Sequence, residues 1–476
     1  MKFIRYYIGL GFLLLLVGCS KDFLEVKQLK SLQVPHTIAD FQAILDYNFA
    51  PGNTAHTLGA NGSDEYIITG TRWAQLATET NAYLRDVYVW SKQINMLQYE
   101  QNKDWNRAYV YIFYANHALA GIEAIEPAGT EQAAWNNVKG SAHFFRAFHY
   151  YALAQQYAFP YMKDADNRNG LPLRLEPDVT LNVQRSSVHA TYEQMLKDAE
   201  KSAALLPAET KRTNYIRPGK AAAYALLAKI HLHMEAYEKA ALYADSCLAL
   251  RGQLVDFNTI GATDPAKQYD YAFEADNGVT NPEVLYYAVS DNGYATALNS
   301  IFKDRAEFNP SLLALYGAGD LRYNVYFRPY IDFDDYRFLV FKGSYAAYGY
   351  FSGLATDEMY LLRSECNART GKTGKALEDI NLLLKNRIAP THFTQVTETD
   401  TEKLLKLIFL ERRKEMVFRG TRWEDLRRQN KEPQFAQTLV REIGGQRYEL
   451  PPNDPRYTWP IPMSEIDAGR VEQNPR

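Results

Sequence analysis

The sequence RPGKAAAYALLAKIHLHMEAYEKAALYADSCLALR, residues 217–251, decides the fold class. Its apolar side chains recur at helical spacing in two runs, which predicts helices over 217–234 and 237–250. Pro218 suits the first turn of one helix, and Gly252 follows the other as a stop signal. The apolar face of the first helix comprises Ala223, Leu226, Leu227, Ile230 and Met234, and that of the second comprises Ala240, Ala244, Cys247 and Leu248.

The same layout occurs again further along the chain, in DEMYLLRSECNARTGKTGKALEDINLLLKNR. This stretch predicts helices over 355–370 and 374–387. An aromatic residue, a small residue and an alanine twelve positions later are typical of tetratricopeptide repeats, which must stack to bury their apolar faces. Two ordinary amphipathic hairpins are the alternative. True repeats are favoured, because one constant offset separates the members of five pairs: Tyr224 and Tyr360, Ala228 and Ser364, Ala240 and Ala376, Ala244 and Ile380, Cys247 and Leu383.

Residues 1–18 predict a signal peptide, because a basic end precedes a short apolar run, Ile8 to Val17. Cys19 follows a glycine directly, as in a bacterial lipoprotein cleavage box, so we expect a lipid such as palmitate on Cys19. A plain secretory signal is the alternative. Residues 19–36 are then expected to form a lipidated tether.

Without the leader the net charge changes from −3 to −5. A mildly acidic chain without basic runs argues against nucleic-acid binding.

Helical periodicity divides the remaining chain into three parts. Residues 37–252 predict an N-terminal helical region, and residues 355–476 a C-terminal region in which helices resume. Between them, residues 253–354 carry scattered Gly, Asn, Asp and Pro with many tyrosines, and only RFLVFK at 337–342 resembles a strand. We therefore expect an all-α fold, a tetratricopeptide-like helical repeat scaffold with a long, loop-rich insertion carrying little strand.

Six blocks of sequence follow one another in a distinctive order: WNRAYVYIFYAN (105–116), RAFHYYALAQQYAFP (146–160), RPGKAAAYALLAKIHL (217–232), DEMYLLRSEC (357–366), ERRKEMVFRGTRWEDLRR (411–428) and WPIPMSEID (459–467). Behind a lipoprotein leader, these blocks resemble the SusD/RagB family of Bacteroidetes outer-membrane nutrient-binding lipoproteins. The resemblance extends over nearly the whole chain. The fifth block and the late PIP are its most specific parts.

The resemblance implies an all-helical fold and a surface lipoprotein that acts as a lid on a partner, a SusC-like TonB-dependent outer-membrane transporter. It also implies capture of an oligosaccharide, or of a peptide, without catalysis. Two positions depart from the family pattern: Arg419 stands where the family often has Glu, and the chain stops at Arg476 after QNP. Both read as local variation within the family.

No catalytic constellation is apparent, and we expect no cofactor and no metal. The charged residues between Glu411 and Arg428 could form an anion-binding site. Their alternation in sign at helical spacing is more typical of a solvated face or a structural ion-pair network, and these two interpretations are favoured. Two rival functions are an exported hydrolase on an α-helical scaffold and a repeat scaffold that binds only proteins. Whether Cys247 and Cys366 are free or bridged is open at this stage.

Ligand contacts are expected on loops, where aromatic rings cover the faces of sugars and polar side chains bond their hydroxyls. Residues 60–90 and 265–350 carry aromatic side chains without helical period, among Gly, Asn and Asp residues. Each of these rings could instead pack on its own lobe. The candidate ligand-binding residues are Trp73, Arg72, Tyr66, Tyr83, Tyr294, Tyr345, Tyr348 and Tyr350.

Overall fold

The computed structural model describes residues 34–476 apart from short gaps, so the predicted leader and Cys19 lie outside the described residues. Within that part of the chain, helices dominate and strands form only two-stranded sheets. The expected all-α fold is confirmed. No helix of the described residues is both long and apolar enough to cross a bilayer. The gaps are residues 50–52, 55–56, 79–81, 101–102, 166–168, 209–214, 262–271, 274–275, 277, 291–305, 332–336, 347–348 and 470.

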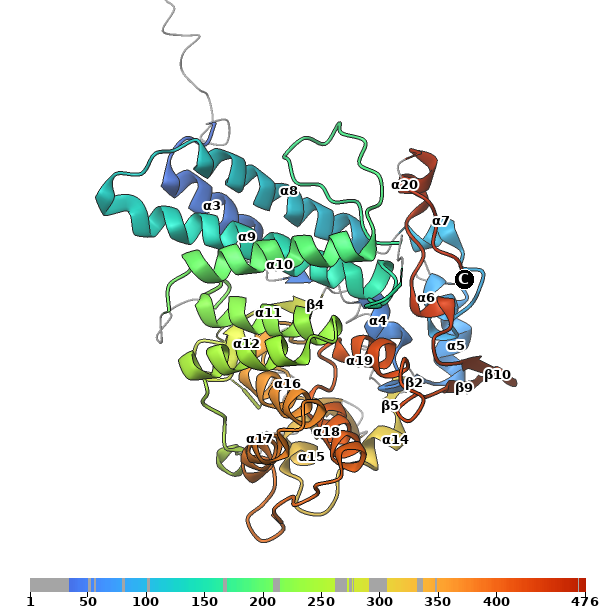
Figure 1. Ribbon diagram of the computed structural model, residues 1–476. Coiled ribbons are helices and arrows are strands. Elements are labelled where there is room, and N and C mark those ends of the chain that lie inside the picture. The colour runs from blue at the N-terminus through green and yellow to red at the C-terminus, as the bar shows by residue number, and fades with distance from the viewer. Residues whose placement is uncertain are drawn as a thin grey trace, which may run out of the picture.

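Four helices form the upper layers in Figure 1: α3 (Ile38–Phe49), α8 (Asp104–Glu123), α9 (Gln132–Tyr157) and α10 (Val188–Leu205). Helix α9 follows a short 3-10 turn, η2 (Gly129–Glu131), and packs against both α8 and α10. Gly121 lets α8 approach α3 closely, because a Cβ there would lie about 2.0 Å from the Phe41 ring. Ser187 caps α10 by accepting a hydrogen bond from the Ala190 amide.

The two predicted repeats occupy the centre of the molecule. Helices α11 (Lys220–His233) and α12 (Tyr237–Leu250) pack together, and α16 (Thr356–Arg369) and α17 (Thr373–Lys385) do the same. The starts of α11 and α16 are separated by the same offset as the starts of α12 and α17, and α12 packs on α16, so the repeats stack. The small positions are fully buried in both copies. Ser364 donates a 2.8 Å hydrogen bond to the Ala376 carbonyl across the second pair.

Two further helices, α18 (Thr401–Glu415) and α19 (Thr421–Gln429), carry a buried ion-pair network. Arg412 contacts Glu358 and Asp425, each at 2.8 Å, and Arg428 contacts Glu365 at 2.5 Å. All five of these residues are buried. Of the two interpretations of the charged block, the structural network is therefore the right one, and it bonds α18 and α19 to α16.

The insertion consists of short elements that pair with distant parts of the chain. Its pieces are η3 (Phe257–Thr259), β3 (Val284–Tyr286), β4 (Val289–Ser290), β5 (Ala306–Phe308), α14 (Pro310–Leu313), α15 (Leu321–Tyr326), β6 (Phe327–Ile331), β7 (Arg337–Phe341) and β8 (Leu354–Ala355). Strands β6 and β7 are antiparallel, with Phe327 opposite Phe341, and β3 pairs with β8. The predicted strand at 337–342 is thus confirmed as β7.

The segment between α3 and α8 also joins the insertion. Its elements are β1 (Asn53–Thr54), α4 (Thr57–Gly62), β2 (Tyr66–Ile68), α5 (Gly70–Leu76), α6 (Tyr83–Tyr88) and α7 (Met96–Tyr99). Strand β1 runs parallel to β4, and β2 runs antiparallel to β5. The two regions predicted to form one ligand surface, 60–90 and 265–350, therefore do meet.

The C-terminal elements lie beside α4–α7 at the right of Figure 1. They are the hairpin β9 (Leu439–Ile443) and β10 (Gln446–Leu450), the turn η4 (Pro455–Tyr457) and α20 (Met463–Asp467). Trp459 is fully buried and stacks on Trp423 of α19 at 5.2 Å. Tyr99 of α7 donates a hydrogen bond to the Pro460 carbonyl. The last residues thus complete the core of the segment between α3 and α8.

Candidate functional site

Most of the residues nominated as ligand contacts lie inside the protein. Trp73 keeps part of its ring exposed, whereas five other candidates are at most 8% exposed. Tyr294 and Tyr348 lie outside the described residues. In this conformation the buried residues present almost no ring surface to a ligand. The five are Arg72, Tyr66, Tyr83, Tyr345 and Tyr350.

Tyr345 lies at the centre of a polar cluster. Its hydroxyl donates a hydrogen bond to the Glu283 carboxylate and lies 3.2 Å from the Asp357 carboxylate, and the Arg419 guanidinium lies 4.2 Å from its ring centre. Burial raises the pKa of the Tyr345 hydroxyl well above its ordinary value, so it remains a donor. These contacts give the ring a structural role.

Three carboxylates in this region, from Glu283, Asp357 and Glu415, lie within 4.8 Å of one another. Their charges are balanced by arginines: Arg387 bonds Glu283 at 2.8 Å and Glu415 at 2.7 Å, while Arg419 pairs with Asp357. The arginines already supply the positive charge that a metal ion would bring. The arrangement is an ion-pair cluster that joins the insertion to α16 and α18.

Other nominated tyrosines pack against aromatic neighbours. Tyr350 lies 5.4 Å from the Phe418 ring, Tyr83 lies 5.9 Å from Tyr99, and Tyr66 lies 5.8 Å from Tyr88. Aromatic pairs at these distances stabilise a core beyond the area that they bury. The absence of a helical period marked these rings as loop-borne, but short strands and turns bury rings without such a period.

Trp73 differs from the buried candidates, because it lies at the edge of the aromatic cluster that contains Tyr66 and Tyr88. Thr69 caps α5 by accepting a hydrogen bond from the Arg72 amide, which places Trp73 on the outer turn of a short helix. The guanidinium of Arg85 lies 4.0 Å from the indole centre, and Tyr448 of the β9–β10 hairpin lies 6.4 Å away. We call these three side chains the Trp73 surface. It combines two rings with one cation, which suits a weak contact with a polar ligand.

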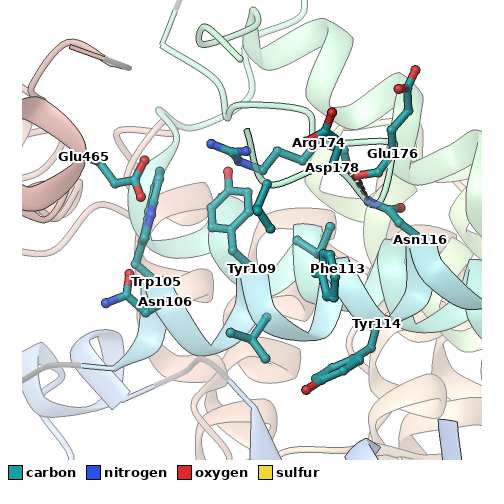
Figure 2. Close-up of a pocket in the computed structure, with 13 residues that line it drawn as sticks. Trp105, Asn106, Tyr109, Phe113, Tyr114, Asn116, Arg174, Glu176, Asp178 and Glu465 are labelled. Carbon is teal, nitrogen blue, oxygen red and sulfur yellow. Dashed lines mark hydrogen bonds between the residues drawn. The ribbon is translucent and has the colours of Figure 1, made fainter. Parts of the chain in front are cut away.

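A larger hollow lies along α8, and Figure 2 shows its lining. This α8 groove has a volume of about 580 Å³ and is lined by side chains of α8, the segment 174–179 and α20. Trp105, Tyr109 and Phe113 follow each other at four-residue spacing, so they form one stripe along the helix. Trp105 is buried and packs 4.9 Å from Tyr109, which closes one end of the stripe.

The segment 174–179 is fixed over the groove by buried donors. Asn116 of α8 bonds the carbonyls of Arg174 and Glu176 at 3.0 and 3.3 Å, and the Tyr150 hydroxyl bonds the Arg174 carbonyl at 2.7 Å. The oxygen of Asn116 in turn accepts from Arg146 at 2.8 Å. Arg146 is paired with buried Asp198, whose pKa is lowered to about 2 by His143 and Arg146 in spite of its burial.

Three carboxylates line the groove, from Glu176, Asp178 and Glu465. The pKa of the exposed Asp178 is lowered by hydrogen bonds from the side chain and amide of Thr180, so this carboxyl is ionised near neutral pH. Asp178 therefore does not have the raised pKa that a general acid for glycoside hydrolysis needs.

Sequence reasoning missed the α8 groove, although one signal was present. The sequence at 105–116 carries an aromatic stripe at four-residue spacing, Trp105, Tyr109 and Phe113, and none of the candidate ligand-binding residues lies on it. The opposite wall comes from the segment 174–179 and from α20, both remote from α8 in the sequence. Their approach to α8 depends on the tertiary fold.

Two protein-family models match separate parts of the chain. Residues 22–232 match a family described as SusD-like, starch-binding associating with outer membrane, and residues 356–476 match the SusD family, SusD_RagB. No curated protein sequence matches the chain.

Solved structures share the fold. One is a SusD superfamily protein from Bacteroides thetaiotaomicron, 21% identical, with a TM-score of 0.71 over 92% of this chain and 100% of that one. A putative sugar binding protein from Bacteroides vulgatus is 20% identical, with a TM-score of 0.71 over 93% of this chain and 99% of that one. A SusD-like carbohydrate binding protein from the same species is 21% identical, with a TM-score of 0.68 over 91% and 97%.

Proposed function

The chain belongs to the SusD/RagB family, and from that premise we propose that it is a cell-surface lipoprotein that captures a nutrient and delivers it to a SusC-like TonB-dependent transporter. The observation that carries the proposal is that both ends of the chain match SusD families while the fold of known SusD superfamily structures covers 92% of it. The cargo is an oligosaccharide or a peptide. Binding without bond cleavage is the proposed activity.

Anchoring is proposed at Cys19, from the sequence LVGC behind a short apolar run. The variant Cys19→Ala should no longer incorporate a labelled fatty acid and should leave the membrane fraction. Continued labelling of that variant would show that the anchor lies elsewhere.

Delivery requires a partner, since the described residues include no helix that could span a membrane. Affinity purification from outer membranes in mild detergents should recover a TonB-dependent receptor in near-equal amount. Recovery of the lipoprotein alone in several detergents would contradict the partnership.

Cargo contact is proposed at the Trp73 surface, with Tyr294 and Tyr348 as further contacts. Trp73 is the described candidate with accessible ring area, and its ring packs against Tyr88, which in turn contacts the buried Tyr66. Stacking of one sugar on one ring is worth about 1 kcal/mol by analogy with aromatic pairs. A few such contacts give affinities in the micromolar range, where a dissociation constant of 1 μM corresponds to about −8.2 kcal/mol. Weak capture suits a protein that must release its cargo to a transporter.

Titration calorimetry with oligosaccharides and with peptide mixtures tests this function. A ligand should bind the wild type without product formation, and Trp73→Ala should weaken binding about tenfold. Tyr47→Ala is the matched control, because Tyr47 is 83% exposed on α3. Undiminished binding by Trp73→Ala would show that the cargo site lies elsewhere on the protein. Product formation would identify the protein as a hydrolase.

A further inference from the structure

We propose that the α8 groove is a second ligand site, distinct from the Trp73 surface, and that it binds an uncharged oligosaccharide. This inference goes beyond the proposed function, because nutrient capture requires only one surface. It is argued from the shape, exposed apolar area, charge and rigidity of the groove.

The floor of the groove matches the repeating form of a sugar chain. Tyr109 and Phe113 are partly exposed and lie one helical turn apart, which corresponds to a rise of about 6 Å along α8. Two sugar rings of a chain can therefore lie on successive aromatic side chains. Buried Trp105 limits the site at one end. A groove of about 580 Å³ falls within the range of ligand sites.

Exposed aliphatic side chains border the aromatic stripe. Val110 on α8 is 49% exposed and Val179 opposite it is 67% exposed, and both line the groove. Apolar side chains that gather around one concave surface mark a binding site more strongly than scattered ones. The C–H faces of a sugar chain would cover Val110 and Val179.

Polar groups stand along one side of the stripe. In Figure 2, Arg174 and Glu465 extend into the groove beside Trp105 and Tyr109, and Asp178 and Glu176 lie on the same segment as Arg174. Carboxylates accept hydrogen bonds from sugar hydroxyls, and a guanidinium donates to them. The groove therefore offers apolar faces and hydroxyl partners together.

The charge of the groove narrows the ligand class. One arginine and three carboxylates line it, which gives a net charge of −2. An anionic sugar, such as a uronic acid or a sulfated unit, would meet repulsion there. A chain of neutral sugars meets none, because its hydroxyls use the carboxylates as acceptors.

The groove is also rigid before a ligand arrives. The carbonyls of Arg174 and Glu176 are held by Asn116, and Tyr109 donates a 2.9 Å hydrogen bond to the Pro172 carbonyl. Burial raises the pKa of the Tyr109 hydroxyl well above its ordinary value, so the donor persists at any physiological pH. A fixed wall loses little conformational freedom on binding, which favours affinity from few contacts.

The test uses the full-length protein with a panel of neutral hexasaccharides: α-glucan, β-glucan, xylan, mannan and galactan fragments. At least one should bind, hexagalacturonate should not, and Phe113→Ala should weaken binding of the neutral ligand at least tenfold. Val179→Trp, which fills the groove from an exposed position, should do the same. Tyr47→Ala is the control, and unchanged melting temperatures show that the variants are folded.

A charge reversal gives a second readout. The double variant Glu176→Lys with Asp178→Lys changes the net charge of the groove from −2 to +2 and should admit hexagalacturonate. All of these titrations are made in the Trp73→Ala background, in which the cargo surface is disabled, so that the binding measured is that of the groove. The proposal is overturned if, in that background, no neutral hexasaccharide binds, if binding survives both Phe113→Ala and Val179→Trp, or if hexagalacturonate binds equally well.

Discussion

The helical repeats and the insertion use aromatic and small residues in opposite ways. In the repeats, small residues such as Ala228 and Ala240 are fully buried where helices approach, and large side chains follow the helical period. In the insertion, Phe308, Phe327 and Phe341 meet one another from three short strands with no period that links them. The comparison teaches that periodicity reveals burial only inside long helices. A cluster of rings in a loop-rich segment can be a small core as well as a binding surface.

The two regions are nevertheless bonded into one structure by buried charges. Arg322 of α15 pairs with Asp320 beside it and with Glu411 and Glu415 of α18. Arg387, after α17, pairs with Glu283 of the insertion. These contacts make the insertion part of the scaffold.

The largest effect is expected from Arg322→Met. Arg322 is fully buried, so its loss leaves three carboxylates short of a partner at the junction of insertion and scaffold. The free energy of unfolding should fall by about 3–5 kcal/mol, measured by urea denaturation. Lys406→Met breaks an exposed pair with Glu402 on the same scaffold and should cost under about 1 kcal/mol. If Arg322→Met and Lys406→Met lowered the free energy of unfolding by equally small amounts, the junction between insertion and scaffold would add no stability.

Phe327→Ala addresses the aromatic core of the insertion. Phe327 is 2% exposed, and its ring lies 4.8 Å from Phe308 and 5.4 Å from Tyr316. Truncation should destabilise the protein by about 3–4 kcal/mol, seen as a lower melting temperature. If these rings formed a ligand surface instead, the melting temperature would stay that of the wild type and only ligand binding would decline.

Acid should weaken the scaffold through Glu358 and Glu365. Burial alone would raise both pKa values, but Lys229 and Arg412 beside Glu358, and Arg428 and Arg369 beside Glu365, lower each of them to about 2. The stabilisation is therefore present above pH 4.5, the ordinary value, and is lost as the pH falls toward 2. It is on the order of 3 kcal/mol for each carboxylate at most.

Melting temperatures measured from pH 6 to pH 2.5 check this dependence. Glu365→Gln should be less stable at pH 6, since Arg428 and Arg369 lose a charged partner while Arg428 keeps Asp425, and its melting temperature should fall less steeply in acid. If the melting temperature of Glu365→Gln fell with pH in parallel with that of the wild type, Glu365 would not contribute to the acid sensitivity of the scaffold.

The smallest effect is expected from Tyr345→Phe. The substitution keeps the ring that Arg419 covers and removes only the hydroxyl that bonds Glu283 and lies close to Asp357. Stability should fall by about 1–2 kcal/mol, while ligand affinity stays unchanged in calorimetry. If Tyr345→Phe instead lost ligand affinity and kept the stability of the wild type, Tyr345 would be a ligand contact, and the rings of the insertion would form a binding surface rather than a core.

The long helices could be predicted closely from the sequence. The helix expected over 217–234 occupies Lys220–His233, and the one expected over 374–387 occupies Thr373–Lys385. A 3.6-residue period is a local signal, so one sequence suffices to read it. The constant offset between the two repeats can also be read from one sequence, because each repeat is recognised by its own helical period.

The candidate site was harder to predict because it depends on pairing across the fold. Tyr66 is buried since β2 pairs with β5, where its partner is Phe308, and no local pattern reports so distant a partner. The α8 groove needs the wall formed by 174–179 and α20, which reach α8 only in the folded chain. The sequence of α8 shows the aromatic stripe but leaves open whether another element covers it.

The contacts of the C-terminal residues with residues 57–104 have a consequence for how the chain is made. Arg441 bonds the Ser63 carbonyl and Arg476 bonds the Ser91 carbonyl, partners separated by 378 and 385 positions. A ribosome adds about 5–20 residues per second, so the first partner would wait roughly 20–80 s for the second. During that time α4–α7 have no complete core. We therefore expect this segment to stay open to chaperones and export factors, so that the chain can still be threaded through a secretion channel before it folds.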